Sequence, residues 1–434
     1  MYVYTSLTLA DTMGRKTDVE NVSISLFSSA GIGDLGIEYG CKVPVVLSAE
    51  LIPKRGELIR QNYPNGEVII GDIRKTKNNI ISTSKQILHG KRPLLITLSP
   101  PCQGMSTNGA GKISAQVKKG KRPKHDERNK LLLPGLEIVK ALQPEFFLIE
   151  NVPNMKNTVV AFKKRKPSKL LDLIPVTVGR GYEILSFVID FTHYGVPHNR
   201  KRLITIGKRT GQKKSTLQSH NSSPKWFDSG SGDEIVSIRK AIGRLNRTRK
   251  NDILHNQPKM NDKHIEWASH IPQNSGQSAH FNGCKNPKCK HIDEFKIVIC
   301  TQCGKPLPRP HVIEKNGSMR AIKGYKTSYR RMYPNEPANT ITMNSGVASS
   351  DNNLHYNQNR VLTLREILIL STVYDLPEKK GLENYPWSDK YTFTHSMKDS
   401  DYPLQKNLIR QALGESIPPL AMQRMVTSLL SDWN

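Results

Sequence analysis

The feature that most constrains the fold of this chain is an alternation of short apolar runs with helical stretches over its first 210 residues. Helices are predicted over 51–61 and 131–142. Alternating strands and helices are typical of an α/β protein with a doubly wound, mostly parallel sheet. Such sheets bind ligands beyond the carboxyl ends of their strands. The predicted strands are 23–28, 44–50, 67–72, 94–99, 146–150, 183–190 and 202–207.

The alternation ends after about residue 210, which indicates a second domain of different character. Segment 215–233 is rich in Ser, Gly and Asn and is typical of a linker. From there to about residue 360 no regular pattern continues, and the last 75 residues contain two more predicted helices, 363–372 and 405–412. We therefore predict an α/β domain of residues 1–215 and 400–434, and a smaller, irregular domain of residues 216–399.

The charge of the chain indicates a polyanionic partner. Its 434 residues include 65 Lys and Arg against 37 Asp and Glu, which gives a formal net charge of +28 and a pI near 9.8. Nucleic acid is the leading partner for such a chain, and an inert basic protein of the ribosomal type is the alternative. The composition, 36% hydrophobic and 24% charged, is that of neither a disordered chain nor a membrane protein.

Three sequence features bear on location. No window approaches the roughly 18 uncharged apolar residues that a bilayer span requires. The first 16 residues carry no pattern of an export signal. Six cysteines are too few for a disulfide scaffold in a chain of this length. We therefore expect a cytoplasmic protein without a membrane partner.

Glycines and acids follow the first three predicted strands. The first strand leads into a G-x-G-x-x-G pattern that contains Gly31 and Gly33, where the backbone can turn tightly and approach a ligand. Glu50 closes the second strand and could accept hydrogen bonds from ribose hydroxyls, and Asp72 closes the third and could accept from an exocyclic amine. The pattern predicts a nucleoside-containing cofactor and leaves nicotinamide dinucleotide and S-adenosylmethionine both open.

Three reactive groups follow the later strands. Cys102 comes after two prolines, which stiffen its loop, and a thiol attacks well only where its surroundings favour the thiolate. Glu150 closes the next strand, and Arg200 and Arg202 flank the start of another. Taken singly, these could be a buried structural cysteine, a solvated acid and a basic surface patch. Together they favour covalent attack by sulfur on an electron-poor heterocycle.

Six segments of the chain form a recognisable series: FSSAGIGDLG, SPPCQGMS, IENVPN, GVPHNRKR, RVLTLREIL and ALGESIPPL. Their order and spacing resemble those of the DNA (cytosine-5) methyltransferases of bacterial restriction-modification systems. The resemblance covers residues 22–210 and 326–425. It implies a Rossmann-like, S-adenosylmethionine-dependent catalytic domain, a target-recognition domain at 216–399, and double-stranded DNA as substrate.

The resemblance implies a role for each reactive group. Cys102 would attack C6 of a cytosine, and Glu150 would bind N3 and the exocyclic amine of that base. Arg202, with Arg200, would help to hold the base and the catalytic loop. The target cytosine would be flipped out of the duplex, because its C6 is shielded inside the helix. The implied contacts of S-adenosylmethionine are Phe27, Gly31, Gly33, Glu50, Asp72 and Ile73.

Three positions depart from the family pattern. His198 stands where Gln is usual, Met105 where Phe is usual, and Glu415 where Asn usually follows Gly. The first two keep polar or apolar character, whereas Glu415 would add an acid near the cofactor.

Two basic segments flank the predicted chemistry. Residues 108–130 carry eight Lys and Arg against two acids, and residues 198–250 carry 14 against three. Such runs are often only solvated surface, but their position here favours contact with DNA phosphates. In the family, the first segment closes over DNA after base flipping.

Four cysteines lie together in the second domain: Cys284, Cys289, Cys300 and Cys303. Four thiolates within 20 residues suit a closed, tetrahedral structural zinc site. The first pair is spaced more widely than usual, so His291 could replace Cys289; four uncoordinated thiols are the alternative. Most of the family lacks this element. We predict a zinc-binding insert at 284–303 that stabilises a DNA-contacting region.

Two other functions stay open from the sequence: a tRNA cytosine-5 methyltransferase on the same scaffold, and a non-catalytic zinc-containing DNA-binding protein. The leading function also implies a cognate restriction endonuclease that acts on the same site. We expect a monomer that associates with the bacterial nucleoid.

Overall fold

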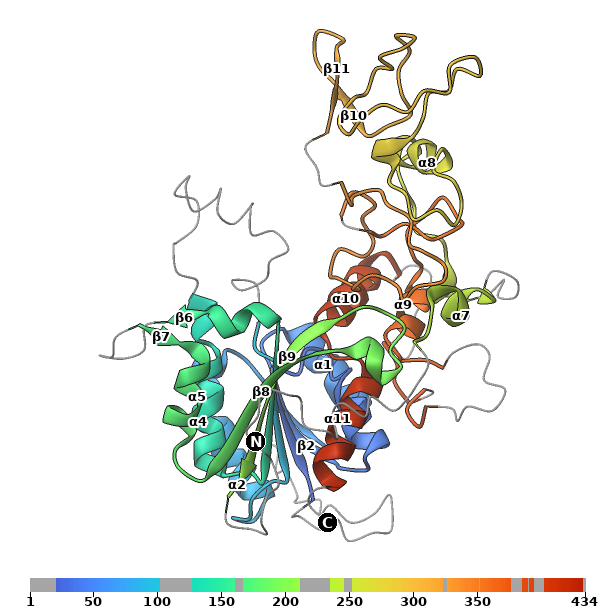
Figure 1. Ribbon diagram of the computed structural model, residues 1–434. Helices are drawn as coiled ribbons and strands as arrows, with labels where there is room; N and C mark the ends of the chain where they lie inside the picture. The colour runs from blue at the N-terminus through green and yellow to red at the C-terminus, as the bar shows by residue number, and fades with distance from the viewer. Residues whose placement is uncertain are drawn as a thin grey trace. The chain divides into compact units, whose positions relative to one another are not determined.

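The structure of the protein is a computed structural model (Figure 1). It describes residues 21–101, 127–160, 167–210, 235–245, 252–322, 326–350, 352–375, 385–388, 390–393 and 402–431. The chain divides into two compact units. Unit 1 comprises Met1–Ile189, Lys201–Ser229 and Met422–Asn434, and unit 2 comprises Asp190–Arg200 and Gly230–Ala421.

Unit 1 is built on a seven-stranded sheet with the order β3-β2-β1-β4-β5-β9-β8. The strands from β3 to β5 run parallel, and β9 pairs antiparallel with β5. This confirms the predicted doubly wound, mostly parallel α/β fold, and each of the seven predicted strands is present. Their bounds are β1 Ser23–Leu26, β2 Val45–Glu50, β3 Glu67–Ile70, β4 Leu95–Leu98, β5 Phe146–Asn151, β8 Tyr182–Asp190 and β9 Lys201–Arg209.

Helices cover both faces of this sheet. Helices α2 (Ile73–Ile87), α4 (Leu132–Leu142) and α5 (Leu170–Val178) lie on one face, and α1 (Pro53–Asn62) lies on the other (Figure 1). The predicted helices 51–61 and 131–142 correspond to α1 and α4. Short additional elements in unit 1 are η1 Gly36–Gly40, η2 Glu127–Lys130, η3 Pro153–Asn157, β6 Val159–Val160 and β7 Ser168–Lys169.

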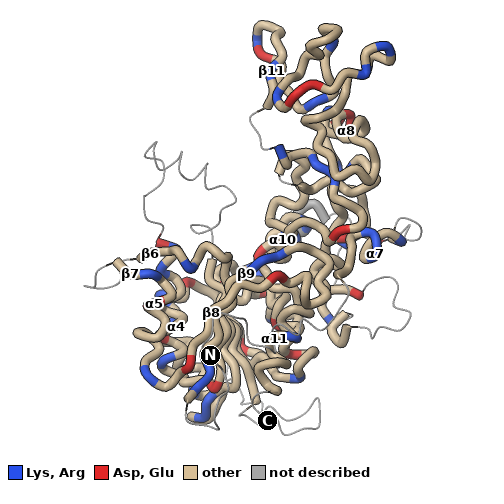
Figure 2. The backbone as a smooth tube through the Cα atoms, in the orientation of Figure 1, with Lys and Arg blue, Asp and Glu red and all other residues tan. Residues whose placement is uncertain are grey.

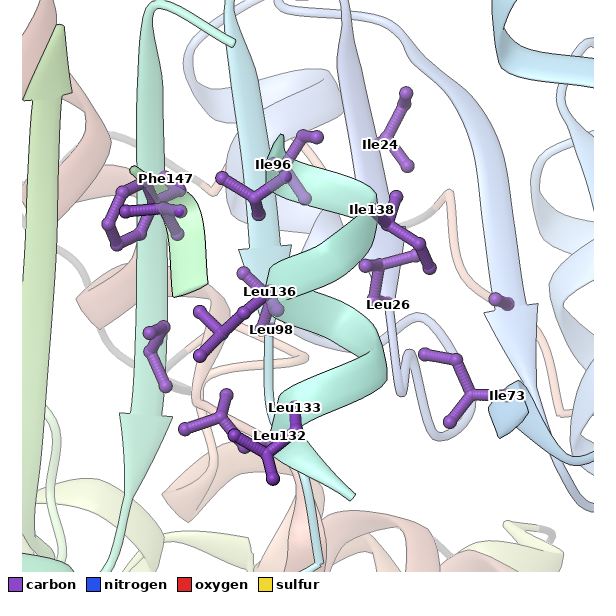
Figure 3. Close-up of a cluster of buried hydrophobic side chains, with 14 of the residues drawn as sticks. Ile24, Leu26, Ile73, Ile96, Leu98, Leu132, Leu133, Leu136, Ile138 and Phe147 are labelled. Atoms are coloured by element: carbon purple, nitrogen blue, oxygen red, sulfur yellow. The ribbon is translucent and has the colours of Figure 1, made fainter. Parts of the chain in front are cut away.

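The core of unit 1 lies between α4 and the sheet. Leu136 of α4 lies over Leu98 of β4, and Ile138 lies beside Leu26 of β1 (Figure 3). Phe147 of β5 belongs to the same buried cluster. Each is fully buried, and burial of such a side chain contributes about 1.5–3 kcal/mol. The apolar residues of α4 recur every three or four positions, which is why the helix buries one stripe on the sheet.

Unit 2 has few long elements. Its helices are α7 Ile238–Ile242, α8 Asp262–Ser269, α9 Leu364–Leu370 and α10 Tyr402–Glu415, and α11 (Pro419–Ser431) continues from it into unit 1. Strands β10 (His311–Ile313) and β11 (Met319–Ala321) form an antiparallel pair. The shorter helical turns are η4 Phe191–Tyr194, η6 Ile253–His255 and η7 Ala279–Phe281. Unit 2 is therefore built largely of irregular segments.

Buried arginines hold the irregular segments of unit 2. Arg331 is 1% exposed and donates hydrogen bonds to the backbone carbonyls of Ala268 at 2.9 Å, His355 at 3.0 Å and Ile271 at 3.3 Å. Buried carbonyls outside helices and strands need such donors, because an unsatisfied one is costly. Lys and Arg are distributed along both units (Figure 2). Among the described residues, no helix has the length and apolarity needed to cross a bilayer.

Candidate active site

The carboxyl ends of β4 and β5 lie side by side and carry the groups predicted for chemistry. Leu98 of β4 pairs with Ile149 of β5, so Pro100 and Glu150 follow at the same edge of the sheet. The side-chain amide of Asn151 donates to the carbonyl of Pro100 at 3.1 Å, and Asn151 is 2% exposed. Cys102, Met105 and most of the basic segment 108–130 lie outside the described residues.

Glu150 and Arg202 form a buried ion pair. Arg202 Nε lies 2.6 Å from Glu150 Oε1, and the two side chains are 13% and 7% exposed, respectively. They come from β9 and β5, which are antiparallel neighbours. Removal of the arginine would leave a buried carboxylate without its cation, which is strongly unfavourable. The pair therefore fixes the orientation of the Glu150 carboxylate at the strand end.

Arg200 has different partners from Arg202. It lies in unit 2, is 1% exposed, and donates from Nη1 to the carbonyls of Gly414 at 3.1 Å and Ile341 at 3.3 Å. These bonds hold the backbone just before Glu415, which ends α10. His198, also in unit 2, is buried and bridges to Ala338.

The loop after β1 has an unusual backbone conformation. The φ angles are 60° at Phe27, 54° at Ser29 and 70° at Gly31, in a region that residues other than glycine rarely adopt. Gly31 also lies against Tyr63, and a Cβ on it would come within 2.7 Å of Tyr63 Cε2. The Tyr63 hydroxyl donates to the Gly31 carbonyl at 2.5 Å. Strained backbone of this kind concentrates at functional sites. The sequence patterns gave no sign of Tyr63, whose contact spans 32 positions.

Glu50 ties the glycine-rich loop to the end of β2. Its Oε2 accepts from the backbone N–H of Ser29 at 2.9 Å, and its Oε1 accepts from that of Ile52 at 3.0 Å. The side chain is buried, and a carboxylate oxygen can accept more than one hydrogen bond. Gly33 lies in the turn that follows, where its carbonyl accepts from Gly36 at 3.1 Å.

Asp72 caps the amino end of α2, just after β3. Its carboxylate accepts from the backbone N–H of Arg74 at 2.9 Å and from the Arg74 guanidinium, which lowers the pKa of Asp72. Ile73, the first residue of α2, is buried. Because β1, β2 and β3 are parallel neighbours, the glycine-rich loop, Glu50 and Asp72 share one edge of the sheet.

Buried polar atoms without a partner support a ligand at this edge. Ser29 Oγ and Asp34 Oδ2 make no hydrogen bond within the part of the chain that the structure describes. Asp34 Oδ1 accepts from Ser25 Oγ at 2.9 Å, and burial raises the pKa of Asp34 to about 7. A glycine-rich loop, two carboxylates at adjacent strand ends and an unpartnered hydroxyl suit a nucleoside with hydroxyl and amine donors. The residues present therefore fit a nucleoside cofactor such as S-adenosylmethionine.

Comparison with protein families decides the class of chemistry. Residues 22–430 match the family described as C-5 cytosine-specific DNA methylase. The chain belongs to this family. It is a DNA (cytosine-5-)-methyltransferase, and the family uses S-adenosylmethionine. The tRNA substrate and the non-catalytic DNA-binding protein that the sequence left open are therefore not favoured.

Individual relatives agree with this assignment over nearly the whole length. The methyltransferase is 29% identical to the type II methyltransferase M1.HgaI of Avibacterium volantium, over 95% of this chain and 98% of that one. It is 25% identical to the type II methyltransferase M1.HphI of Haemophilus parahaemolyticus, over 94% and 86% of the two chains.

Two solved structures share the fold. One is a prophage-encoded E. coli protein described as a DNA modification methyltransferase, with a TM-score of 0.54 and 18% identity over 95% of this chain and 99% of that one. The other is the Dnmt2 methyltransferase of S. pombe, with a TM-score of 0.51 and 14% identity over 95% and 99% of the two chains.

The four distal cysteines of this methyltransferase come together in unit 2. Their sulfur atoms all lie within 4.8 Å of one another. Cys284 Sγ is 3.4 Å from Cys303 Sγ, and Cys289 Sγ is 3.7 Å from Cys300 Sγ. Four sulfurs at about 2.3 Å from one tetrahedral metal ion would be about 3.8 Å apart. The arrangement can therefore hold one metal ion with little movement.

His291 lies beside this group and interacts with other residues. Its Nε2 is 3.3 Å from Thr301 Oγ1 and 3.5 Å from Asp293 Oδ1, and its side chain is 41% exposed. Its backbone carbonyl accepts from the N–H of Cys284 at 2.8 Å. The candidate ligands are therefore the four cysteines, and they include Cys289 rather than His291.

Proposed function

We propose that this methyltransferase is the modification enzyme of a type II restriction-modification system and methylates one cytosine within a specific sequence of double-stranded DNA. The names and lengths of its bacterial relatives support this assignment. The structural observation that carries it is the buried Glu150–Arg202 pair beside the Pro100 loop, which leads to Cys102. A cognate endonuclease would cut the same sequence when it is unmethylated.

The proposed chemistry is a covalent addition to the pyrimidine ring. The Cys102 thiolate forms a bond with C6 of a flipped cytosine, while Glu150, held by Arg202, binds N3 and the exocyclic amine and stabilises the charge that moves onto the ring. C5 thereby becomes nucleophilic. S-Adenosylmethionine, when bound, supplies the methyl group. Loss of the C5 proton then restores the ring and expels the Cys102 thiolate.

The proposed cofactor contacts lie at the ends of β1 to β3. Glu50 would accept from the ribose hydroxyls, and Asp72 would accept from the adenine amine once Arg74 yields part of its contact. Phe27, Gly31 and Gly33 would line the approach, and Ile73 would pack against the adenine ring. Unit 2 would supply target recognition, and its surface lysines and arginines would contact phosphates.

Covalent trapping tests the central step. In the presence of S-adenosylmethionine, a duplex with 5-fluorocytosine at the target position should form a stable adduct with the wild-type protein, because after methyl transfer the fluorine at C5 cannot leave as a proton would. Cys102→Ala should form none, and Cys41→Ser, which alters another cysteine, should react like the wild type. A Cys102→Ala adduct of normal yield would contradict the proposal, as would a failure of the wild type to react with any duplex.

We also propose that Cys284, Cys289, Cys300 and Cys303 hold a structural zinc ion in a closed tetrahedral site. Four protein thiolates leave no open position for a substrate, so the ion would stabilise the segment 284–303. Elemental analysis of the purified protein should give one zinc per chain, and Cys300→Ser should lower this value. Zinc contents near zero for protein purified with zinc in the medium would contradict the proposal.

We expect a monomer that acts in the bacterial cytoplasm, beside the nucleoid. Duplex DNA offers a repeating negative surface for a chain of net charge +28. Light scattering of the protein alone and bound to one target duplex tests the first expectation. A mass of about 49 kDa for the free protein would agree with it, and twice that mass would contradict it.

A further inference from the structure

Arg309 is a buried cation within the cysteine-rich segment of unit 2. Its side chain is 1% exposed, and its guanidinium donates four hydrogen bonds, all to backbone carbonyls. An arginine offers five N–H donors in a rigid, planar fork, so four fixed acceptors hold it in one orientation.

The acceptors of Arg309 surround the cysteines. Nε donates to the carbonyl of Asn282 at 2.7 Å, two residues before Cys284. The two terminal nitrogens donate to carbonyls between Cys289 and Cys300. These are Asp293 at 2.8 Å, Glu294 at 2.7 Å and Ile297 at 3.1 Å. Arg309 therefore joins the segment that enters the first cysteine pair to the segment that leads into the second.

Asp293 links Arg309 to the second cysteine pair, Cys300 and Cys303. Its carboxylate, whose side chain is 2% exposed, accepts from the backbone N–H of Thr301 at 3.2 Å and from the Thr301 hydroxyl at 2.5 Å. Thr301 lies in the turn between Cys300 and Cys303, which ends at Gly304 with a φ of 69°. The backbone carbonyl of Asp293 accepts from Arg309, and its carboxylate accepts from Thr301 in the cysteine turn. Asp293 therefore links Arg309 to this turn.

The charge of Arg309 also suits this place. Four thiolates around a divalent cation leave two net negative charges, and a nearby buried cation offsets them. Arg309 interacts electrostatically with Cys300 and with Asp293. The lysines of the segment, Lys285, Lys288, Lys290, Lys296 and Lys305, are exposed and so offset the charge less.

We infer that Arg309 is the positioning residue of the metal site: it holds the four thiols in place for a thiophilic divalent cation, without being a ligand. The inference rests on the zinc ion proposed above. It gives the segment a site that is assembled before the metal arrives, whereas most small metal sites form only as the metal binds. Groups that support metal ligands without touching the metal typically contribute 10- to 100-fold to affinity.

Metal titration of the full-length protein tests the inference. The metal-free protein is titrated with Co²⁺, whose absorption reports tetrahedral thiolate ligation, and Zn²⁺ affinity is then measured against a chromophoric chelator. Arg309→Lys keeps the charge but cannot make four bonds, and should lower Zn²⁺ affinity about 10- to 100-fold. Arg320→Lys, an exposed arginine of β11, is the control and should stay within twofold.

Two further measurements separate the outcomes. Binding of S-adenosylmethionine, which depends on unit 1, should be the same in each variant and reports that the chain has folded. Asp293→Ala removes the link to the cysteine turn and should also lower Zn²⁺ affinity, whether or not Arg309→Lys can be purified. Wild-type affinity in both variants would overturn the role of Arg309. Failure of the wild type to bind one Co²⁺ per chain would instead overturn the zinc proposal.

Discussion

Single side chains hold the loops and strand ends together at the carboxyl ends of the parallel strands of unit 1. The sequence patterns pointed to Glu50, Asp72 and Glu150, because acids at the ends of apolar strands are visible in a linear pattern. They did not point to Tyr63, Asn151 or the Ser25–Asp34 pair. Those residues act through contacts with distant backbone or with the opposite side of a loop, which no local pattern encodes.

Asn151 should position the loop that carries Cys102. Its amide is the donor to the Pro100 carbonyl, so Asn151→Asp, which cannot donate, should slow adduct formation with 5-fluorocytosine DNA about 10- to 100-fold. Affinity for S-adenosylmethionine should not change. Asn157→Ala, an exposed asparagine of η3, is the matched control. An equal loss in both variants, or none in Asn151→Asp, would show that the bond does not position the loop.

Asp34 should make unit 1 less stable as the pH rises. Its pKa is about 7 in the folded protein against 3.8 as a free side chain, because burial disfavours its ionised form and Glu38 adds repulsion. The folded state therefore binds more protons between pH 4 and pH 7, and stability falls across that window. Asp34→Asn should remove this loss, and its stabilising effect should be about 2–3 kcal/mol larger at pH 8 than at pH 5. Urea unfolding at both pH values measures the difference; an equal effect at both would contradict the assignment.

The elements of the fold differ in how well the sequence predicted them. The strands of unit 1 were predicted because continuous apolar runs are typical of a buried parallel sheet. Helix α9 was predicted within a few residues, and Thr363 and Glu366 form a capping box at its start. Helix α11 was not predicted. Pro419 begins this helix, in agreement with the preference for proline in the first turn of a helix.

Unit 2 shows the limit of such patterns. Its segments are held by Arg309 and Arg331, which bond to backbone carbonyls rather than extend a helix or strand. A basic residue in a loop gives no sign in the sequence that it is buried. The four clustered cysteines of unit 2, by contrast, were visible as a spacing pattern.

Packing between α4 and β4 should contribute strongly to the stability of unit 1. Leu136 is fully buried there, so Leu136→Ala should destabilise the protein by about 2–5 kcal/mol. Val176→Ala on α5 is the control, since Val176 is 49% exposed, and should change stability by less than about 0.5 kcal/mol. Urea unfolding followed by circular dichroism gives both values. A loss below about 1 kcal/mol for Leu136→Ala would mean that this interface is not the core of unit 1.

At the scale of the whole molecule, an α/β unit with Glu50, Asp72 and Glu150 at the carboxyl ends of its strands is continuous in sequence with a unit that contains four clustered cysteines. The family and the fold could be predicted from the sequence, since the six segments keep their order and spacing across the chain. The target sequence could not, because base recognition depends on which side chains of unit 2 reach the groove edges.

The proposed methylation of DNA through Cys102 can be tested by bisulfite sequencing of DNA from bacteria that express the chain, since this reports the modified base and its sequence context together. The proposed function predicts 5-methylcytosine at one position of one recurring sequence, and none in cells that express Cys102→Ser at the same level. Methylation that persists in the Cys102→Ser cells, or wild-type cells without 5-methylcytosine, would contradict it.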